Sequence, residues 1–205
     1  MSNAPEPFHL ADEAAAVLAD RTGVPSHDVV LVLGSGWAAA ADGLGEIVAD
    51  VPLDELPGFP APTVLGHRNS ALSVRVGDTN ALVLGGRVHL YEGHPTATVV
   101  HGVRTAIAAG CGVVVLTNAA GGLNPDWPVG QPVLIADQLN LTGASPMAGP
   151  APPPDRPIRF TDLTEAYSSR LRALALDVDP TLPEGIYAGL LGGAFETPAE
   201  IRMMA

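Results

Sequence analysis

The segment DVVLVLGSG, Asp28–Gly36, joins an uninterrupted apolar run to two closely spaced glycines. Strands that are buried on both faces of a parallel sheet are typically continuous runs of Val, Leu and Ile. The glycines that follow permit a tight turn and let backbone N–H groups approach a bound anion. The segment therefore predicts a central strand of an α/β domain, with a ligand site at the carboxyl end of that strand.

Outward from this segment, strand-like and helical patterns alternate along the chain. Apolar runs predict further strands at Ala71–Asp78, Ala81–Leu84, Gly112–Asn118, Gln131–Leu141 and Gly185–Leu191. We expect the first of these to face solvent on one side and Gly112–Asn118 to be buried. Helical spacing predicts helices around Leu10–Leu18, Val99–Gly110 and Leu163–Leu174. This order predicts an α/β fold, with a mixed, largely parallel central sheet flanked by helices, in a single domain over residues 1–205.

Composition excludes several classes of function. The chain has 22 acidic and 10 basic residues, a formal charge of −12, and every basic residue is an arginine. A non-specific nucleic-acid binder carries the opposite balance, so no nucleic-acid partner is expected. Without lysine there is no Schiff-base lysine and no phosphate-binding P-loop lysine.

The single cysteine and the N-terminal segment also limit the possibilities. Cys111 has no second cysteine to pair with, so neither a disulfide nor a cysteine-rich metal site is expected. The first twenty residues carry acids where a signal peptide needs an apolar stretch. We therefore expect a cytoplasmic protein that does not associate with membranes.

The segment LVLGGRVHLYEGHP, Leu82–Pro95, places Arg87, His89 and Tyr91 at every second position. In an extended chain, alternate residues share one face. A guanidinium, an imidazole and a phenol on one face suggest a site for an anionic, polyhydroxylated ligand. A structural salt bridge to Arg87 is the alternative explanation.

Three other segments leave more than one interpretation open. Gly34-Ser35-Gly36 begins a match to G-x-G-x-x-A, which would suit a nucleotide- or dinucleotide-binding module, although a ligand-free turn has the same pattern. The loop after Asn118 is built of small residues and follows a strand, where ligands often bind. Phe195 and Glu196 precede a helix start and suit a flat heterocycle with N–H donors, but core packing and helix-dipole compensation would need the same residues.

Taken together, several segments resemble the trimeric, low-molecular-mass purine nucleoside phosphorylases. In chain order they are GSG, LPGFP…TVLGH, GRVHLYEGHP, VVLTNAAGGLNP and FETPAEIRM, and the resemblance extends from about Val29 to the last residue. The related methylthioadenosine phosphorylases differ at HLYEGHP and typically lack the glutamate of FETPAE. The resemblance therefore favours the purine nucleoside branch and the nucleoside phosphorylase fold.

The resemblance implies a role for each matching residue. The phosphate-binding residues would be Ser35, His67, Arg87, His89 and the backbone N–H of Ala119. Tyr91 would contact the ribose, and Phe160 would be lent to the ribose pocket of a neighbouring subunit. Phe195 and Glu196 would bind the purine. His89 and Glu196 would be the catalytic residues.

The implied reaction is reversible phosphorolysis, in which inorganic phosphate is the co-substrate and no metal or organic cofactor takes part. A 6-oxopurine ribonucleoside or deoxyribonucleoside would give the free base and (deoxy)ribose 1-phosphate. Adenosine would be a poor substrate, because its N1 lacks the proton that Glu196 would accept. The expected assembly is a homotrimer.

The last residues predict a helix that has only begun. Thr197 is the expected N-cap, Pro198 occupies the first helical position and Glu200, three residues after Thr197, completes a capping box. Members of the family continue well past this point, so the chain is expected to be C-terminally incomplete, and an inactive remnant is an alternative to an enzyme. The segment LLGGAFE also departs from the glycine-proline pair usual in the family.

Overall fold

The computed structural model describes residues 6–34, 36–61, 69–149, 152–154, 156 and 160–205. It divides the chain into two compact units, Met1–Ala120 and Gly121–Ala205. Each unit is described by itself below. The single domain over residues 1–205 stays a prediction.

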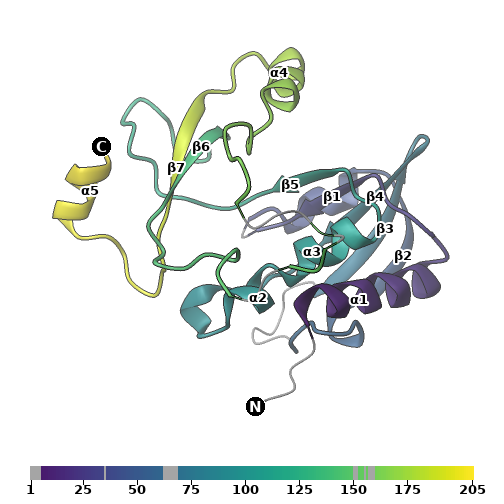
Figure 1. The fold of residues 1–205 in the computed structure, drawn as a ribbon. Coiled ribbons are helices and arrows are strands. Elements are labelled where there is room, and N and C mark those ends of the chain that lie inside the picture. Colours follow the sequence, from purple (N-terminus) through teal and green to yellow (C-terminus); the bar gives the residue numbers. More distant parts are fainter. Residues whose placement is uncertain (1–5, 35, 62–68, 150–151, 155, 157–159) are drawn as a thin grey trace. The chain divides into compact units, whose positions relative to one another are not determined.

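The first unit is built on a five-stranded sheet with the order β2-β3-β4-β1-β5 (Figure 1). Its strands are β1 (Val29–Val32), β2 (Glu46–Pro52), β3 (Ser70–Val76), β4 (Thr79–Leu84) and β5 (Val113–Leu116). β1 runs parallel to β4 on one side and to β5 on the other, whereas β2, β3 and β4 are antiparallel neighbours. The expected α/β fold with a mixed sheet is confirmed.

The register of the parallel strands brings their carboxyl ends to one level. Val32, the last residue of β1, lies opposite Leu84 of β4 and Leu116 of β5. The segments that follow these three residues therefore leave the sheet side by side. After β1 the chain continues to β2 at one end of the sheet, whereas after β4 it continues to β5 at the other end. Open α/β sheets bind ligands where neighbouring connections run in opposite directions in this way.

Helices α1 (Pro7–Thr22) and α3 (His101–Ala108) pack against each other beside this sheet (Figure 1). The short helix α2 (Thr96–Val99) precedes α3. α1 ends at Gly23, whose φ of 69° places it in the left-handed region that glycine adopts without strain. The helices expected around Leu10–Leu18 and Val99–Gly110 are confirmed, the second as two consecutive segments.

The alternation of side chains along the strands fills a hydrophobic cluster on each face of the sheet. Val30, Val32 and Leu82 join Leu18 of α1 and Ala106 of α3 in one cluster. The residues between them, such as Leu31 and Val83, point to the opposite face and contribute to a second cluster, to which the 3₁₀ helix Ala38–Gly43 adds Ala41. This explains why the apolar run of β1 has no polar position, because both of its faces are covered.

Two expectations about strand burial are wrong. In β3 the residues from Ser70 to Val74 are all buried, because β3 lies between β2 and β4 and both of its faces are packed. In β5, by contrast, Val115 is 40% and Leu116 57% exposed. Among the described residues β5 is the last strand of its sheet, so it lacks a neighbour on one side.

The extended chain expected to continue to Tyr91 ends earlier, so a strand that carries Arg87, His89 and Tyr91 is also a wrong expectation. β4 stops at Leu84, the next five residues have no regular structure, and Leu90–Glu92 forms a 3₁₀ helix. His89 begins that turn, and its N–H donates to the Glu92 carboxylate at 2.7 Å. Gly85 and Gly86 are conformationally permissive, so the chain can turn away from the sheet at this point. The hydrogen bond from the His89 N–H to Glu92 then favours a turn over a strand.

The second unit contains a two-stranded parallel sheet and two helices. The strands are β6 (Leu134–Asn140) and β7 (Glu184–Gly189), and the helices are α4 (Ser169–Val178) and α5 (Pro198–Met204). The helix expected from Leu163 begins only at Ser169, because Ser168 caps it by accepting a hydrogen bond from the Leu171 N–H. Asp162 instead binds the backbone and hydroxyl of Thr164 in a local turn.

The helix expected after Thr197 is confirmed. Thr197 is the N-cap of α5, and its N–H donates to the Glu200 carboxylate at 2.7 Å. In return, the Glu200 N–H donates to the Thr197 hydroxyl at 3.3 Å. These two bonds form the capping box that the sequence spacing indicated. None of the helices in the described part of the chain combines the length and apolar character needed to cross a membrane.

His27 makes the stability of the first unit dependent on pH. Its side chain is 1% exposed, its Nε2 lies 3.0 Å from the Ser73 hydroxyl, and its Nδ1 has no hydrogen-bond partner. Burial lowers the pKa of His27 below its ordinary value of 6.5, although the Asp28 carboxylate acts in the opposite direction. Because the unfolded chain binds the proton more readily, stability is full above 6.5 and is lost as the pH falls below that value.

We expect the free energy of unfolding, measured with urea, to fall by about 1 kcal/mol through His27 between about pH 7.5 and 5.5. H27Q removes the titrating group and should lose correspondingly less stability over this interval. H9Q is the matched control, because it makes the same substitution at His9, which is exposed. Identical pH dependence in H27Q and the unsubstituted chain would contradict this account.

Candidate active site

Three residues from different loops meet at the carboxyl ends of β4, β1 and β5. Arg87 follows β4, Gly34 follows β1 and Thr117 follows β5. The Arg87 Nη1 donates to the Thr117 carbonyl at 2.6 Å, and the Gly34 N–H donates to the Thr117 hydroxyl at 2.9 Å. A cation is thereby held at the edge of the sheet where α/β proteins bind ligands.

Gly34 allows the Arg87 guanidinium to approach the backbone closely. A Cβ atom at Gly34 would lie 2.4 Å from the Thr117 carbonyl oxygen and 2.7 Å from both terminal nitrogens of Arg87. No side chain fits there without moving the backbone or the guanidinium. Since the Gly34 N–H is already bonded to the Thr117 hydroxyl, this glycine provides space for the guanidinium.

His89 and Tyr91 lie together beyond Arg87, although not on a strand. Their rings stack, with centroids 5.0 Å apart and an angle of 15° between the planes. Burial lowers the pKa of His89, the positive charge of Arg87 lowers it further, and Glu92 acts in the opposite direction. These effects favour the neutral form of His89, in which one ring nitrogen can donate and the other can accept a hydrogen bond. Tyr91 is 54% exposed and can meet a ligand.

The other phosphate-binding residues expected from the resemblance are only partly described. Ser35 and His67 lie outside the described residues. Ala119 is exposed in the loop after β5, two residues beyond Thr117. Within the first unit, the structure thus brings Arg87 together with Gly34 and Thr117, and His89 together with Tyr91.

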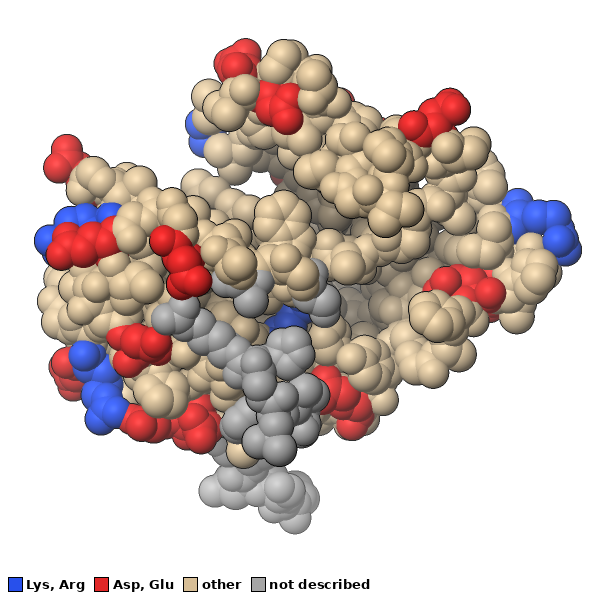
Figure 2. Space-filling view, turned by 180° about the vertical axis from the view of Figure 1, so that it is seen from behind, with Lys and Arg blue, Asp and Glu red and all other residues tan. Residues whose placement is uncertain are grey.

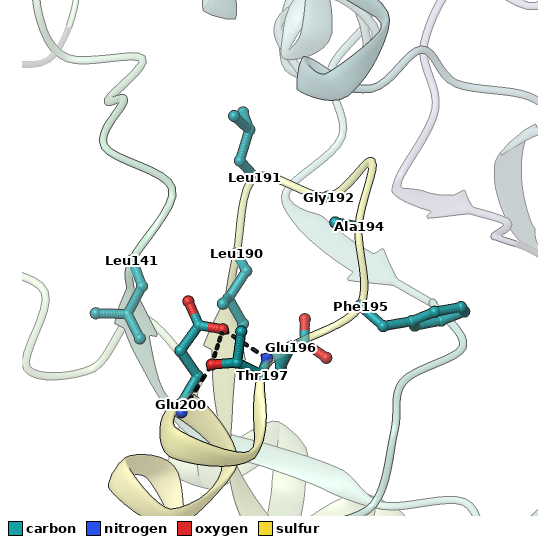
Figure 3. Close-up of a pocket in the computed structure, with 9 residues that line it drawn as sticks. All are labelled: Leu141, Leu190, Leu191, Gly192, Ala194, Phe195, Glu196, Thr197 and Glu200. Atoms are coloured by element: carbon teal, nitrogen blue, oxygen red, sulfur yellow. Dashed lines mark hydrogen bonds between the residues drawn. The ribbon is translucent and has the colours of Figure 1, made fainter.

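The residues expected to bind the purine lie in the second unit. Glu196 lines a pocket of about 370 Å³ that is formed by residues of the 190–200 segment together with Leu141 (Figure 3). Glu196 directly precedes the capping box of α5, whose hydrogen bonds fix the backbone next to it. The ring of Phe195 is 98% exposed and extends away from the Glu196 carboxylate (Figure 3). Phe160, the residue expected to serve a neighbouring subunit, is 88% exposed.

Sequence reasoning missed three contributors to these sites. They are Thr117, which holds Arg87 and Gly34, Glu92, which caps the His89 turn, and Glu200, which shares the pocket with Glu196. For Glu200 the capping-box spacing was visible in the sequence, but its proximity to the pocket was not. Thr117 had no local signal, because its partners are 83 and 30 residues away in the chain.

Two further observations concern other chemistries. Burial raises the pKa of Cys111 to about 11, so this thiol stays protonated at neutral pH, as a structural cysteine does. Among the described residues, no three His, Cys, Asp or Glu side chains form a cluster that could hold a metal ion.

Comparisons with known proteins identify the family. Residues 28–205 match the model of the phosphorylase superfamily. A purine nucleoside phosphorylase from Mycobacterium tuberculosis is 56% identical over 200 residues, which are 98% of this chain and 72% of the relative. One from Cellulomonas sp. is 54% identical over 205 residues, with coverage of 98% of this chain and 70% of the relative.

Solved structures agree with this result. A purine nucleoside phosphorylase in complex with ribose-1-phosphate matches with a TM-score of 0.83 and 28% identity, over 96% of this chain and 74% of that structure. The Schistosoma mansoni enzyme in complex with inosine matches with a TM-score of 0.82 and 28% identity, over 95% of this chain and 70% of that structure. The chain therefore belongs to the phosphorylase superfamily and, within it, to the purine nucleoside phosphorylases.

Proposed function

We propose that the chain catalyses the reversible phosphorolysis of 6-oxopurine ribonucleosides and deoxyribonucleosides. The products are the free purine and (deoxy)ribose 1-phosphate, and inorganic phosphate is the co-substrate. The observation that carries the proposal is the 54–56% identity to purine nucleoside phosphorylases over 98% of the chain. The chain spans 70–72% of the length of these relatives.

Phosphate binding is assigned to Ser35, His67, Arg87, His89 and the backbone N–H of Ala119. The guanidinium of Arg87, held at the carboxyl ends of three strands by Thr117, supports this assignment. The acidic surface does not oppose it, although Figure 2 shows carboxylates spread over the visible face. Charges are screened beyond about 8 Å at physiological ionic strength, so the groups that touch the phosphate dominate its binding.

The proposed chemistry follows from these assignments. A phosphate oxygen forms a bond to C1′ as the bond from C1′ to the purine nitrogen breaks, and that electron pair leaves with the base. The sugar gains oxocarbenium character in the transition state, so the phosphate anion beneath it is stabilising. Neutral His89 can donate to a phosphate oxygen, and Tyr91 lies against the ribose. Glu196 accepts hydrogen bonds from the purine edge and holds the leaving base.

The first test is purine release from inosine by the purified chain, measured by absorbance with and without inorganic phosphate. Phosphate-dependent release of hypoxanthine is the expected result. Release that does not depend on phosphate would indicate hydrolysis instead, and no release would contradict the proposal. The relatives give no support to the alternatives of a nucleotide-binding module or an inactive remnant.

Glu196 is expected to determine the preference for 6-oxopurines. In E196Q the carboxylate becomes an amide, so a charge-assisted hydrogen bond from the protonated N1 of inosine is lost. We expect kcat/KM for inosine to fall about thirtyfold, which corresponds to about 2 kcal/mol for one such bond. The KM for phosphate should change much less.

E13Q is the matched control for this substitution, because Glu13 is exposed on α1 and the same atoms are exchanged. It should leave the kinetics of inosine unchanged. If E196Q retained the full kcat/KM for inosine, Glu196 would not be the residue that binds the purine.

The homotrimer is a further part of this proposal and rests on the resemblance. The cytoplasmic location, expected from the composition of the N-terminal segment, is kept as a proposal with it. The exposed ring of Phe160 supports a role between subunits, because a large apolar side chain with 88% exposure is available to a neighbouring chain. Light scattering on the purified chain measures the assembly directly.

A further inference from the structure

We propose that Thr117 is a positioning residue for phosphate binding, which acts by fixing both Arg87 and the backbone at Gly34. This inference rests on the proposed function, since it assigns to Arg87 the role of phosphate ligand. Thr117 itself is not expected to touch the substrate. Its contribution comes from two groups, the side-chain hydroxyl and the main-chain carbonyl.

The Thr117 hydroxyl joins β5 to β1 just beyond the last paired residues. It accepts a hydrogen bond from the Gly34 N–H at 2.9 Å and donates to the Val32 carbonyl at 3.2 Å. The Thr117 N–H reaches the same carbonyl at 3.1 Å. A hydroxyl can donate once and accept in other directions, so this side chain serves both partners at the same time. The Gly34 peptide is thereby held in one orientation.

The Thr117 carbonyl sets the direction of the guanidinium. It accepts a hydrogen bond of 2.6 Å from the Arg87 Nη1. The donors of arginine lie in one rigid plane, so a bond to one of them fixes where the others point. The opposite wall is the α-carbon of Gly34, where even a Cβ atom would come within 2.7 Å of both terminal nitrogens. The Arg87 guanidinium thus lies between the Thr117 carbonyl and the Gly34 backbone, and Thr117 fixes the position of both.

Loss of the Thr117 hydroxyl would allow the Gly34 backbone to move, whereas the Thr117 carbonyl would still accept the hydrogen bond from Arg87. The Gly34 N–H would lose its acceptor in a partly buried position, and the peptide would turn to find another. The guanidinium would then sample more orientations and present its donors to phosphate less often. The chemistry of Arg87 would be unaltered, so affinity for phosphate would fall more than the rate at saturation.

Two substitutions separate the hydroxyl from the shape of the side chain. T117V has nearly the same volume but no hydroxyl, whereas T117S keeps the hydroxyl and removes a methyl group. In T117V we expect the KM for phosphate to rise about tenfold, the factor that one lost hydrogen bond of ordinary strength gives. The KM for inosine and kcat should change less than about twofold by the same reasoning. T117S should behave like the unsubstituted chain.

The outcomes distinguish this inference from the proposed function. If the unsubstituted chain is active and T117V has an unchanged KM for phosphate, the inference is wrong and the proposed function stands. The same holds if T117S loses as much affinity as T117V, or if T117V raises both KM values together. If the unsubstituted chain neither releases purine nor binds inorganic phosphate in calorimetry, the proposed function fails and the inference fails with it.

A measurement on the unsubstituted chain does not depend on whether T117V folds. Amide hydrogen exchange should find the Gly34 N–H protected, because its acceptor is the Thr117 hydroxyl. Exchange of the Gly34 amide at the rate of a solvated glycine would show that the hydroxyl does not hold this peptide, and would overturn the inference.

Discussion

Substitution R87Q is expected to lower kcat/KM for phosphate about a thousandfold. Hydrogen bonds to charged groups contribute about 1.5–3 kcal/mol each, so the loss of two of them gives a factor of this size. Glutamine can still reach a carbonyl such as that of Thr117, but it carries no charge and cannot form the forked contact that arginine makes with phosphate. Initial rates of purine release at varied phosphate concentration measure the effect.

R75Q is the matched control for R87Q. Arg75 is exposed near the end of β3, so the same change in charge there should leave the KM for phosphate within about twofold of its original value, as surface substitutions normally do. The KM for phosphate of R87K should lie between those of R87Q and R75Q, because lysine keeps the charge but lacks the planar fork of arginine. An R87Q variant with an unchanged KM for phosphate would remove Arg87 from the proposed site.

Substitution G34A is expected to lower kcat/KM for phosphate about a hundredfold, because a displacement of roughly 1 Å in a binding group has effects of this order. The added methyl would meet the Thr117 carbonyl oxygen at 2.4 Å and the Arg87 terminal nitrogens at 2.7 Å. Neither distance is tolerable, so the guanidinium must leave its position or the two loops must separate. Overpacking of this kind also destabilises a protein by about 1–3 kcal/mol. Phosphate-dependent kinetics and urea unfolding of the same preparation report the two effects separately.

G43A is the matched control, since it adds the same methyl group where no atom lies within 4 Å apart from its chain neighbours and the backbone of its own helix. It should retain the phosphate kinetics of the unsubstituted chain. If G34A bound phosphate normally, the close packing of Arg87 on Gly34 would be irrelevant to function. If G34A lost stability but kept its KM for phosphate, Gly34 would have a structural role alone.

Local patterns in the sequence were sufficient for the elements that depend on near neighbours. The apolar run of β1, the helical spacing of α1 and the capping box of α5 each involve residues only a few positions apart. Interactions between near neighbours do not depend on the strand order of the sheet. The patterns that reflect them therefore predicted these elements correctly. The identity of Arg87, His89 and Glu196 as residues of interest was also visible, because their chemistry is unusual in its sequence context.

Predictions that depended on distant neighbours were less successful. The burial of β3 and the exposure of β5 follow from their places in the sheet order, which no local pattern contains. The turn at Leu90–Glu92 arises because the Glu92 carboxylate caps the His89 N–H, a bond that competes with extension of β4. Apolar alternation alone cannot decide between these two conformations.

The sequence by itself determined the α/β class, the central strand β1, the helix start at Thr197 and the residue types that could bind an anion and a purine. Only the tertiary structure decided that Gly34, Arg87 and Thr117 meet, because parallel strands place the ends of distant segments at one level. Thr117 is 83 residues from Gly34 and 30 from Arg87, and its hydroxyl and carbonyl gain partners only when the sheet has formed. Local propensity acts over a few residues, whereas the site depends on strand order and register.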